Sequence, residues 1–249
     1  DKFKSIATGS SGFCDCVLGW DVDDQLYDNV SFTGWHTAFP DAPYRIDLAT
    51  ERRLQEENGV PLFLIEFIGD EYGHPVCPRS RLKQVLSLAE EMGYAPRMAF
   101  EYEFFIFRET SQSVRDKNYQ DLVPLTPGNF GYSVLRTLAQ SELFNEFMDY
   151  CDDHGFELEG LHCETGPGVW EAAISVDDAL AAADKAVLFK TFAKAFFQRR
   201  EMIATFMAKW SMDYPGQSGH VHQSLNAINT AQNLFFEESD PHNMSDTMR

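Results

Sequence analysis

EYEFFIF, residues 101–107, places two carboxylates two positions apart in a run of aromatic and apolar residues. Aromatic and β-branched residues favour strands, and alternate side chains of a strand point to opposite faces. The segment is therefore predicted to be a strand that presents Glu101 and Glu103 on one face. The next basic residue along the chain is Arg108, so no neighbour in the segment balances the two charges. The pair indicates either a bound cation or a solvated face.

The segments before this strand predict a small β-rich unit followed by a helix. Residues 13–22, 60–70 and 74–76 are β-rich, and the turn sequence between the last two predicts a hairpin. From Pro78 to Gly93 apolar residues recur at helical spacing. The chain is therefore predicted to be an α+β protein, with a small N-terminal domain over residues 1–77 and a larger domain over residues 78–249.

The segments after the strand predict alternating helices and strands. Residues 108–132 are polar and rich in turn residues, which favours a loop, and a helix is expected over residues 133–154. Residues 156–175 indicate two strands around a Gly-Pro-Gly turn, after which Ser175 caps a long, buried helix that extends towards Trp210. The final segment, residues 214–225, is predicted to form a turn and a strand.

The composition excludes several classes of partner. The 249 residues carry a net charge of −19, which disfavours nucleic acid and anionic membranes. No apolar run approaches the roughly 18 residues that span a bilayer. The first residues contain no basic n-region followed by an apolar h-region, so we expect no signal peptide. The five cysteines include no C-x-x-C pair, so we expect free thiols and a cytoplasmic protein.

Three separate segments each offer a pair of metal-type ligands. Besides the pair in residues 101–107, Glu164 and Glu171 flank a tight turn, and His220 and His222 have strand spacing. Carboxylates with an occasional imidazole suit a hard divalent ion, Mg²⁺ or Mn²⁺. So many carboxylates on one surface repel one another unless cations lie between them. Two or more ions would relieve this repulsion and form a site that binds phosphates.

Each pair has a plainer interpretation when it is taken alone. An E-x-E strand is more often an exposed face with salt bridges, and H-x-H also occurs in zinc enzymes of the amidohydrolase type. The joint appearance of the three pairs in this order is more specific than any one of them. An unrelated zinc metallohydrolase remains an alternative, although it leaves the two glutamate pairs unexplained.

The order of the motifs resembles that of the glutamine synthetase family, which includes relatives that make γ-glutamyl amides from other amines. That family has an E-x-E strand, an E-x-x-P-G-Q-x-E-like turn and a G-x-x-x-H-x-H-x-S strand, and this chain has EYEFF, ETGPGVWE and GQSGHVHQS. PRSRLKQVL and YDNVSFTGW also resemble family segments, the latter the F-D-G-S-S loop. The resemblance covers essentially the whole chain. It implies a β-grasp-like N-terminal domain and a catalytic domain with a curved antiparallel sheet and flanking helices.

The resemblance implies roles for individual residues. Glu103, Glu164 and Glu171 would hold the ion nearest glutamate, while Glu101 and His220 would hold the ion nearest the ATP phosphates. The remaining implied site residues are His222 and Ser224 at the nucleotide, Gly216 and Tyr132 at the substrate, and Asp28 at the ammonium ion. The γ-carboxylate of glutamate would attack the γ-phosphate of ATP, and ammonia or an amine would then displace phosphate. Family members form large ring-shaped homo-oligomers with shared active sites.

Two departures from the family pattern concern the substrate pockets. Asp28 is followed by Asn-Val-Ser, and Pro215-Gly216 replaces an Asn-Gly pair, so the amine is left open. Family members also continue past residue 249 with phosphate-binding arginines, and the chain is expected to lack this C-terminal part. A non-catalytic relative that keeps the fold for assembly or binding is the alternative function.

Overall fold

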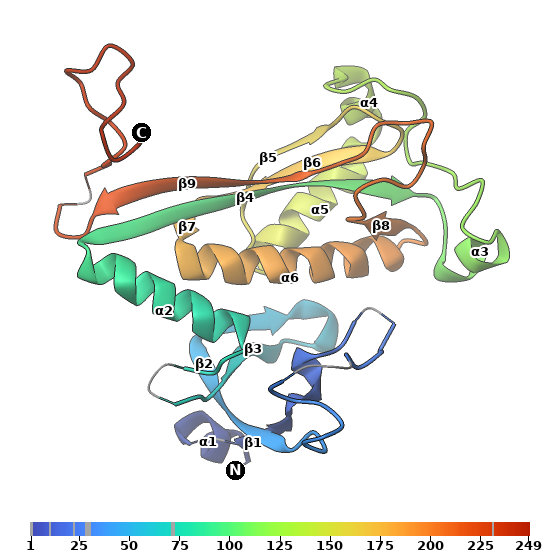
Figure 1. Ribbon diagram of the computed structural model, residues 1–249. Coiled ribbons are helices and arrows are strands. Elements are labelled where there is room, and N and C mark those ends of the chain that lie inside the picture. The colour runs from blue at the N-terminus through green and yellow to red at the C-terminus, as the bar shows by residue number, and fades with distance from the viewer. Residues whose placement is uncertain (1, 10, 22, 28–30, 71–72, 231) are drawn as a thin grey trace. The chain divides into compact units, whose positions relative to one another are not determined.

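The computed structural model describes residues 2–9, 11–21, 23–27, 31–70, 73–230 and 232–249 (Figure 1). The chain forms two compact units, Asp1–Gly93 and Tyr94–Arg249. Each unit combines helices with an antiparallel sheet, so the predicted α+β class is confirmed. The first unit includes helix α2 (Pro78–Glu91). The domain division at residues 77/78 stays a prediction. No helix among the described residues is long and apolar enough to span a membrane.

The first unit is built on a three-stranded antiparallel sheet of order β1-β2-β3. Its elements are α1 (Lys2–Thr8), β1 (Ser11–Cys14), the 3-10 helix η1 (Asp15–Leu18), β2 (Asp41–Leu54), the 3-10 helix η2 (Gln55–Glu57), β3 (Val60–Phe67) and α2. The hairpin predicted between residues 60–70 and 74–76 is wrong, because β3 pairs with β2 and residues 74–76 form no strand.

Strand β2 was missed because its charged residues obscure the alternation of apolar ones. Tyr44, Ile46 and Leu48 alternate with charged or small residues, which indicates a half-buried strand. The turn that joins β2 to β3 includes Asn58 and Gly59 at φ values of 56° and 78°. An Asn-Gly pair is the sequence signal of a tight hairpin, because both residues tolerate positive φ.

The second unit is organised around one long strand, β4 (Tyr94–Phe107), which contains the EYEFFIF segment. All of its pairings are antiparallel: β6 (Val169–Ile174) and β7 (Asp177–Asp178) lie along one edge, and β8 (Ile203–Thr205) and β9 (Gly219–Ala227) along the other. Strand β5 (Leu158–Cys163) pairs with β6 (Figure 1). The predicted strands on either side of the Gly-Pro-Gly turn and around the two histidines are therefore confirmed.

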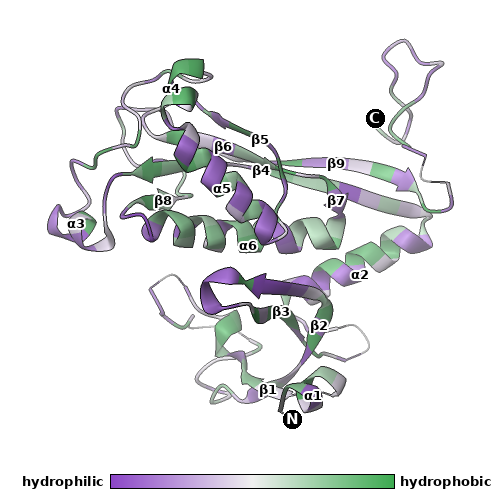
Figure 2. Ribbon diagram, turned by 180° about the vertical axis from the view of Figure 1, so that it is seen from behind, coloured by the Kyte–Doolittle hydropathy of each residue, from purple (hydrophilic) through white to green (hydrophobic). Residues whose placement is uncertain are grey.

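Two helices cover one face of this sheet and form its core. Helix α5 (Ser141–Asp153) contributes Phe147, and α6 (Ala179–Gln198) contributes Phe189 and Phe197. These rings surround Phe104 of β4 at centroid distances of 6.3, 6.3 and 6.1 Å, and Phe104 is fully buried. Figure 2 shows α6 as predominantly hydrophobic along its length. At Tyr102 and Phe104 the even-numbered face of β4 is thus used for packing, which leaves Glu101 and Glu103 on the other face. Nearer the end of the strand both faces are buried, because Phe105 and Phe107 form a further core cluster with Val169.

The helix boundaries differ from the predicted ones in three places. The helix expected over residues 133–154 is interrupted at Gln140, whose backbone is not helical, so that α4 (Val134–Ala139) and α5 are separate. Helix α6 begins at Ala179 because residues 177–178 pair with β4 as strand β7, and Ser175 does not cap it. The predicted loop over residues 108–132 contains the short helix α3 (Ser111–Asp116).

We expect the change Thr110→Ala to lower the free energy of unfolding by about 1 kcal/mol. The Thr110 hydroxyl accepts a hydrogen bond from the Ser113 amide at 3.0 Å, and the Ser113 hydroxyl accepts one from the Thr110 amide at 2.9 Å. The change removes the first of these bonds and leaves an amide of α3 without its partner. Urea unfolding measures the effect, and Ser111→Ala, a change at the exposed neighbouring position, serves as the control. Equal stabilities of the two variants would contradict the role of Thr110 as the cap of α3.

Candidate metal centre

Glu101 and Glu103 lie on the face of β4 opposite the two packing helices. The side chains between and beside them, Tyr102 and Phe104, face the helices, and Tyr102 stacks on Phe189 with ring centroids 5.9 Å apart. Because successive side chains of a strand alternate, burial of these aromatic rings directs both carboxylates to the other face. The predicted orientation of the pair is therefore what the structure shows.

Strand register brings the three predicted ligand pairs together. Glu103 of β4 lies directly opposite Glu171 of β6, and Glu101 lies opposite His220 of β9. On the far side of β6, His162 of β5 lies opposite Glu171. Directly opposed side chains in an antiparallel pair have Cβ atoms about 4.5–5.5 Å apart. Four neighbouring strands thus build one cluster of carboxylates and imidazoles from segments distant in sequence.

Glu101 is the centre of one half of this cluster. Its Oε2 lies 2.7 Å from Nε2 of His222 and 3.3 Å from Nδ1 of His220. A hydrogen bond with Glu171 and those with the two histidines lower the pKa of Glu101 to about 2, although burial opposes the shift. Glu101 therefore stays ionised across the physiological pH range.

The pKa of Glu171 is shifted in the opposite direction, upward. It is 8% exposed, and burial raises its pKa to about 8 together with the hydrogen bond to Glu101 and the negative charges of Glu101, Glu103 and Glu164. These four carboxylates cannot all ionise at neutral pH without a positive charge between them. A proton or a cation must therefore occupy the centre of the cluster.

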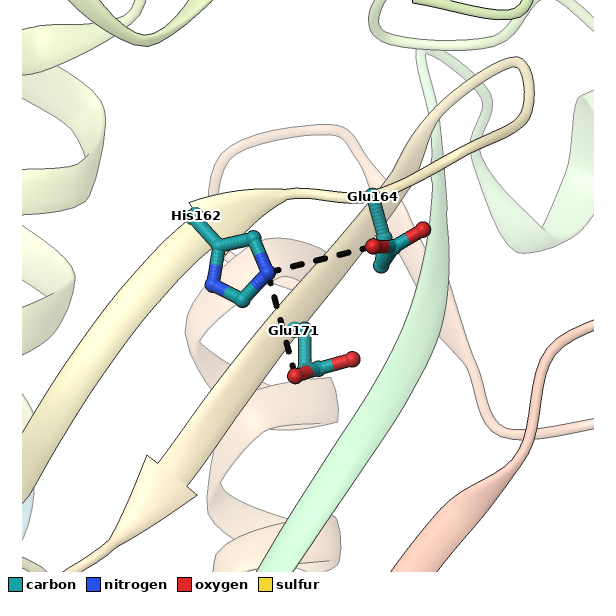
Figure 3. Close-up of side chains that lie close together, drawn as sticks. All are labelled: His162, Glu164 and Glu171. Carbon is teal, nitrogen blue, oxygen red and sulfur yellow. Dashed lines mark ion pairs between the residues drawn. The ribbon is translucent and has the colours of Figure 1, made fainter. Parts of the chain in front are cut away.

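The closest grouping of ligand atoms contains a histidine that the sequence analysis did not select. One ligand atom each of His162, Glu164 and Glu171 lies within 4.8 Å of the other two (Figure 3). His162 Nε2 is 4.0 Å from Glu164 Oε1 and 3.8 Å from Glu171 Oε1, and it is buried without a hydrogen-bond partner among the described residues. His162 and Glu164 have the same i, i+2 spacing as the pair Glu101 and Glu103 and the pair His220 and His222. This signal could have identified the histidine.

Tyr132 lies against this grouping. Its ring stacks on His162 with centroids 5.2 Å apart, and its amide donates to the carbonyl of Cys163 at 2.7 Å. A hydrogen bond with Glu164, together with the negative charge of that residue, raises the pKa of Tyr132 to about 12. Burial raises the pKa of Glu164, but hydrogen bonds from Tyr132 and Thr165 outweigh it, and the net shift is downward. Glu164 is thus held ionised and oriented.

Ser218, directly before β9, orients Glu103. Its amide donates to Glu103 Oε2 at 3.0 Å, and its hydroxyl donates to Oε1 at 3.2 Å. The same hydroxyl lies 3.4 Å from Nε2 of His220. The serine therefore contacts both halves of the cluster. This role depends on the pairing of the segment with β4, where the Glu103 amide donates to the Ser218 carbonyl at 3.1 Å.

A cavity of about 440 Å³ adjoins the cluster in the second unit. Glu101, His222 and Ser224 line it, together with Arg97, whose Nη1 atom lies 2.6 Å from Asp178 Oδ1. The structure thus places His222 and Ser224, the residues predicted to bind a nucleotide, on the wall of one cavity beside a predicted metal ligand.

Two predicted site residues are not part of this cluster as described. Gly216 is not among the residues that line the cavity, and a Cβ atom there would lie 2.6 Å from the carbonyl oxygen of Ala208, so the position requires glycine. Asp28 lies outside the residues that the structure describes.

A protein-family model described as "Glutamine synthetase, catalytic domain" matches residues 75–249. The chain is 46% identical to "Type-1 glutamine synthetase 2" of Dictyostelium discoideum, an alignment that covers 100% of this chain and 48% of the relative. It is 36% identical to "Glutamate--isopropylamine ligase" of Pseudomonas sp over 85% of this chain and 46% of the relative. The chain thus spans about half the length of these curated relatives.

Solved structures support the same fold. The ligand-free structure of a protein named GmaS superimposes with a TM-score of 0.79 at 21% sequence identity, covering 99% of this chain and 53% of that one. At this level of identity the similarity shows the arrangement of strands and helices.

Proposed function

Because the chain belongs to the glutamine synthetase family, we propose that it forms part of a carbon–nitrogen ligase that uses ATP to join an amine to the γ-carboxylate of glutamate. The main support is the cluster in which Glu101, Glu103, Glu164 and Glu171 converge with imidazoles on four neighbouring strands. Transfer of a phosphoryl group to a carboxylate brings two anions together, so it requires concentrated positive charge. A cluster that itself needs cations is suited to this task.

The donor atoms fit divalent metal ions, which the family generally uses together with ATP. Carboxylate oxygens with one or two imidazole nitrogens suit Mg²⁺ or Mn²⁺. We propose that Glu103, Glu164 and Glu171 hold one ion and that Glu101 and His220 hold a second. The buried Nε2 of His162, which makes no hydrogen bond with a described residue, and the raised pKa of Glu171 support a cation at the first position. When bound, the ions would neutralise charge on the phosphates and on glutamate.

The other residues would bind and orient the substrates. His222 and Ser224 would contact the nucleotide, in keeping with their place on the cavity wall. Gly216 would leave room for the amino acid, and Tyr132 and Asp28 would adjoin the amine. The γ-carboxylate of glutamate would attack the γ-phosphate of ATP, and the amine would then displace phosphate from γ-glutamyl phosphate.

The amine is proposed as ammonia or a small primary amine. The two curated relatives are named for glutamine synthesis and for isopropylamine ligation, so the family accepts more than one amine. The test is glutamate-dependent phosphate release from ATP, with the protein expressed from its complete coding sequence and with ammonia, methylamine, ethanolamine and isopropylamine. We expect at least one amine to raise the rate about tenfold or more. No amine-dependent release would favour the non-catalytic alternative.

We further propose a cytoplasmic, ring-shaped homo-oligomer with active sites shared between neighbours. The five cysteines are all free, which suits a reducing compartment. Light scattering on the complete protein tests the assembly, and a monomer would overturn the ring.

Binding of Mn²⁺ is expected to strengthen about tenfold for each pH unit between pH 6 and pH 8. Without the ion, the raised pKa of Glu171 keeps this group protonated below about pH 8, so the metal must displace a proton. The gain should stop above that pH, where Glu171 is already ionised. Titration calorimetry in buffers of different ionisation enthalpy measures both the affinity and the proton released. A dissociation constant that is constant from pH 6 to pH 8 would contradict this account.

A further inference from the structure

Cys14 and Cys16 form a pair of thiols where strand β1 passes into η1, within the first compact unit. Both residues are half-buried, whereas the other three cysteines of the chain, Cys77, Cys151 and Cys163, are buried. Neither member of the pair has a role in the ligase reaction proposed above. The pair therefore holds the thiols that a reagent in solution can reach in the folded protein.

The backbone between the two thiols has the geometry that a disulfide requires. Cys14 directly precedes η1, and Asp15 is the first residue of this 3-10 helix. The dihedral angles of the middle residue set the separation of two Cα atoms that lie two positions apart. That separation is about 5 Å across a helical residue, but about 7 Å in an extended chain. Most disulfides have Cα atoms about 5.5–6 Å apart, so the helical turn brings the two cysteines close to this range.

The two side chains also contact each other. A hydrogen bond with the Cys14 side chain, burial, and the negative charges of Cys14 and Asp15 together raise the pKa of Cys16 to about 11. Cys14 Sγ donates its own proton to the carbonyl oxygen of Phe39 at 3.5 Å, so it is the acceptor of the proton of Cys16. Cys16 therefore keeps its proton at neutral pH, and Cys14 is left as the first nucleophile of the pair.

We propose that Cys14 and Cys16 form a redox modification site, which a low-molecular-weight disulfide such as oxidised glutathione converts reversibly into an intramolecular disulfide. The thiolate of Cys14 attacks one sulfur of oxidised glutathione, forms a mixed disulfide and releases one glutathione. Cys16 then gives up its proton, attacks the Cys14 sulfur and releases the second glutathione. The protein loses two electrons and two protons, and oxidised glutathione gains them as two thiols. Excess reduced glutathione reverses both steps.

A single tryptic peptide reports on the pair. Residues 5–45 lie between Lys4 and Arg45, and they contain Cys14 and Cys16 but no other cysteine and no internal cleavage site. The complete protein is incubated with oxidised glutathione, quenched in acid, unfolded, alkylated and digested for mass spectrometry. We expect residues 5–45 to carry no alkyl group and to be two hydrogens lighter, with two glutathione thiols released per chain. Dithiothreitol should restore two alkylated thiols.

Two variants separate the two steps of the reaction. Cys16→Ser should stop the reaction at a glutathione adduct of Cys14, with one glutathione released per chain. Cys151→Ala, which removes a buried thiol of the other unit, should react as the unchanged protein does. The readout is the state of the thiols, not turnover, so this test fails or succeeds separately from that of the ligase reaction.

The unfolded chain shows whether the fold builds the site. In urea we expect the ratio of disulfide to mixed disulfide to fall at least about tenfold, because η1 no longer holds the two thiols together. Equal ratios in the folded and the unfolded protein would overturn the proposal. So would a lack of reaction, a mixed disulfide that persists in the unchanged protein, or a disulfide that links either residue to another cysteine.

Discussion

Replacing Glu103 by alanine is expected to lower the rate of glutamate- and amine-dependent phosphate release at least about a thousandfold, which corresponds to about 4 kcal/mol of transition-state stabilisation. Glu103 lies opposite Glu171 and is oriented by both hydrogen bonds from Ser218. Its loss removes one proposed ligand of the ion nearest glutamate. Glu101→Ala should have a similar effect, through the ion nearest the nucleotide.

The control for these variants is Glu157→Ala, which removes an exposed carboxylate of the same unit outside the cluster. All three proteins should unfold at similar urea concentrations, because Glu101 and Glu103 are not part of the packed face of β4. Near-full activity in either cluster variant would show that the carboxylate does not serve the reaction. A collapse of stability in one of them would instead indicate a structural role.

The change Glu171→Gln is expected to weaken Mn²⁺ binding at least about a hundredfold, or about 2.7 kcal/mol, with little change in the stability of the metal-free protein. The amide has the size of the carboxyl group but cannot become an anion. Because burial and the neighbouring carboxylates raise the pKa of Glu171 to about 8, this group is largely protonated and neutral at pH 7 without a metal. The substitution is therefore expected to change the free energy of unfolding of the metal-free protein little and to lower the affinity for the ion.

Calorimetric titration with Mn²⁺ at pH 7.5 and urea unfolding in the presence of a chelator measure the two parts of this prediction. Glu171→Gln should also abolish the pH dependence of the affinity expected between pH 6 and pH 8. Glu157→Gln serves as the matched control and should bind Mn²⁺ normally. Unchanged affinity in Glu171→Gln would remove this residue from the metal site and would weaken the whole assignment.

Local sequence patterns predicted the central elements of the second unit. Alternation in EYEFFIF identified β4 and the face of its two glutamates. The Gly-Pro-Gly turn identified β5 and β6, and the H-x-H spacing identified β9. These signals are strong because the period of a strand is two residues, which neighbouring letters of the sequence record directly.

The errors arose where distant partners compete with local preference. Asp177 and Asp178 suit the first turn of a helix, but their backbone pairs with β4. Asp177 also forms an ion pair with Lys185, in which Oδ2 lies 2.6 Å from Nζ. The charged residues of β2 obscured its strand pattern, and the structure shows the strand paired with β3. At residues 177–178 a long-range backbone pairing thus outweighed the propensity of the segment itself.

The sequence by itself determined the ligand types, their spacing within each strand and the family to which their order belongs. Only the tertiary structure decided which ligands meet. Register placed His162 opposite Glu171, and the segment before β9 brought Ser218 to Glu103. Hydrogen bonds lowered the pKa of Glu101, while burial and the hydrogen bond to Glu101 raised that of Glu171. The reason is physical: hydrogen bonds and electrostatic interactions depend on distance and desolvation, which are properties of the folded sheet and not of positions along the chain.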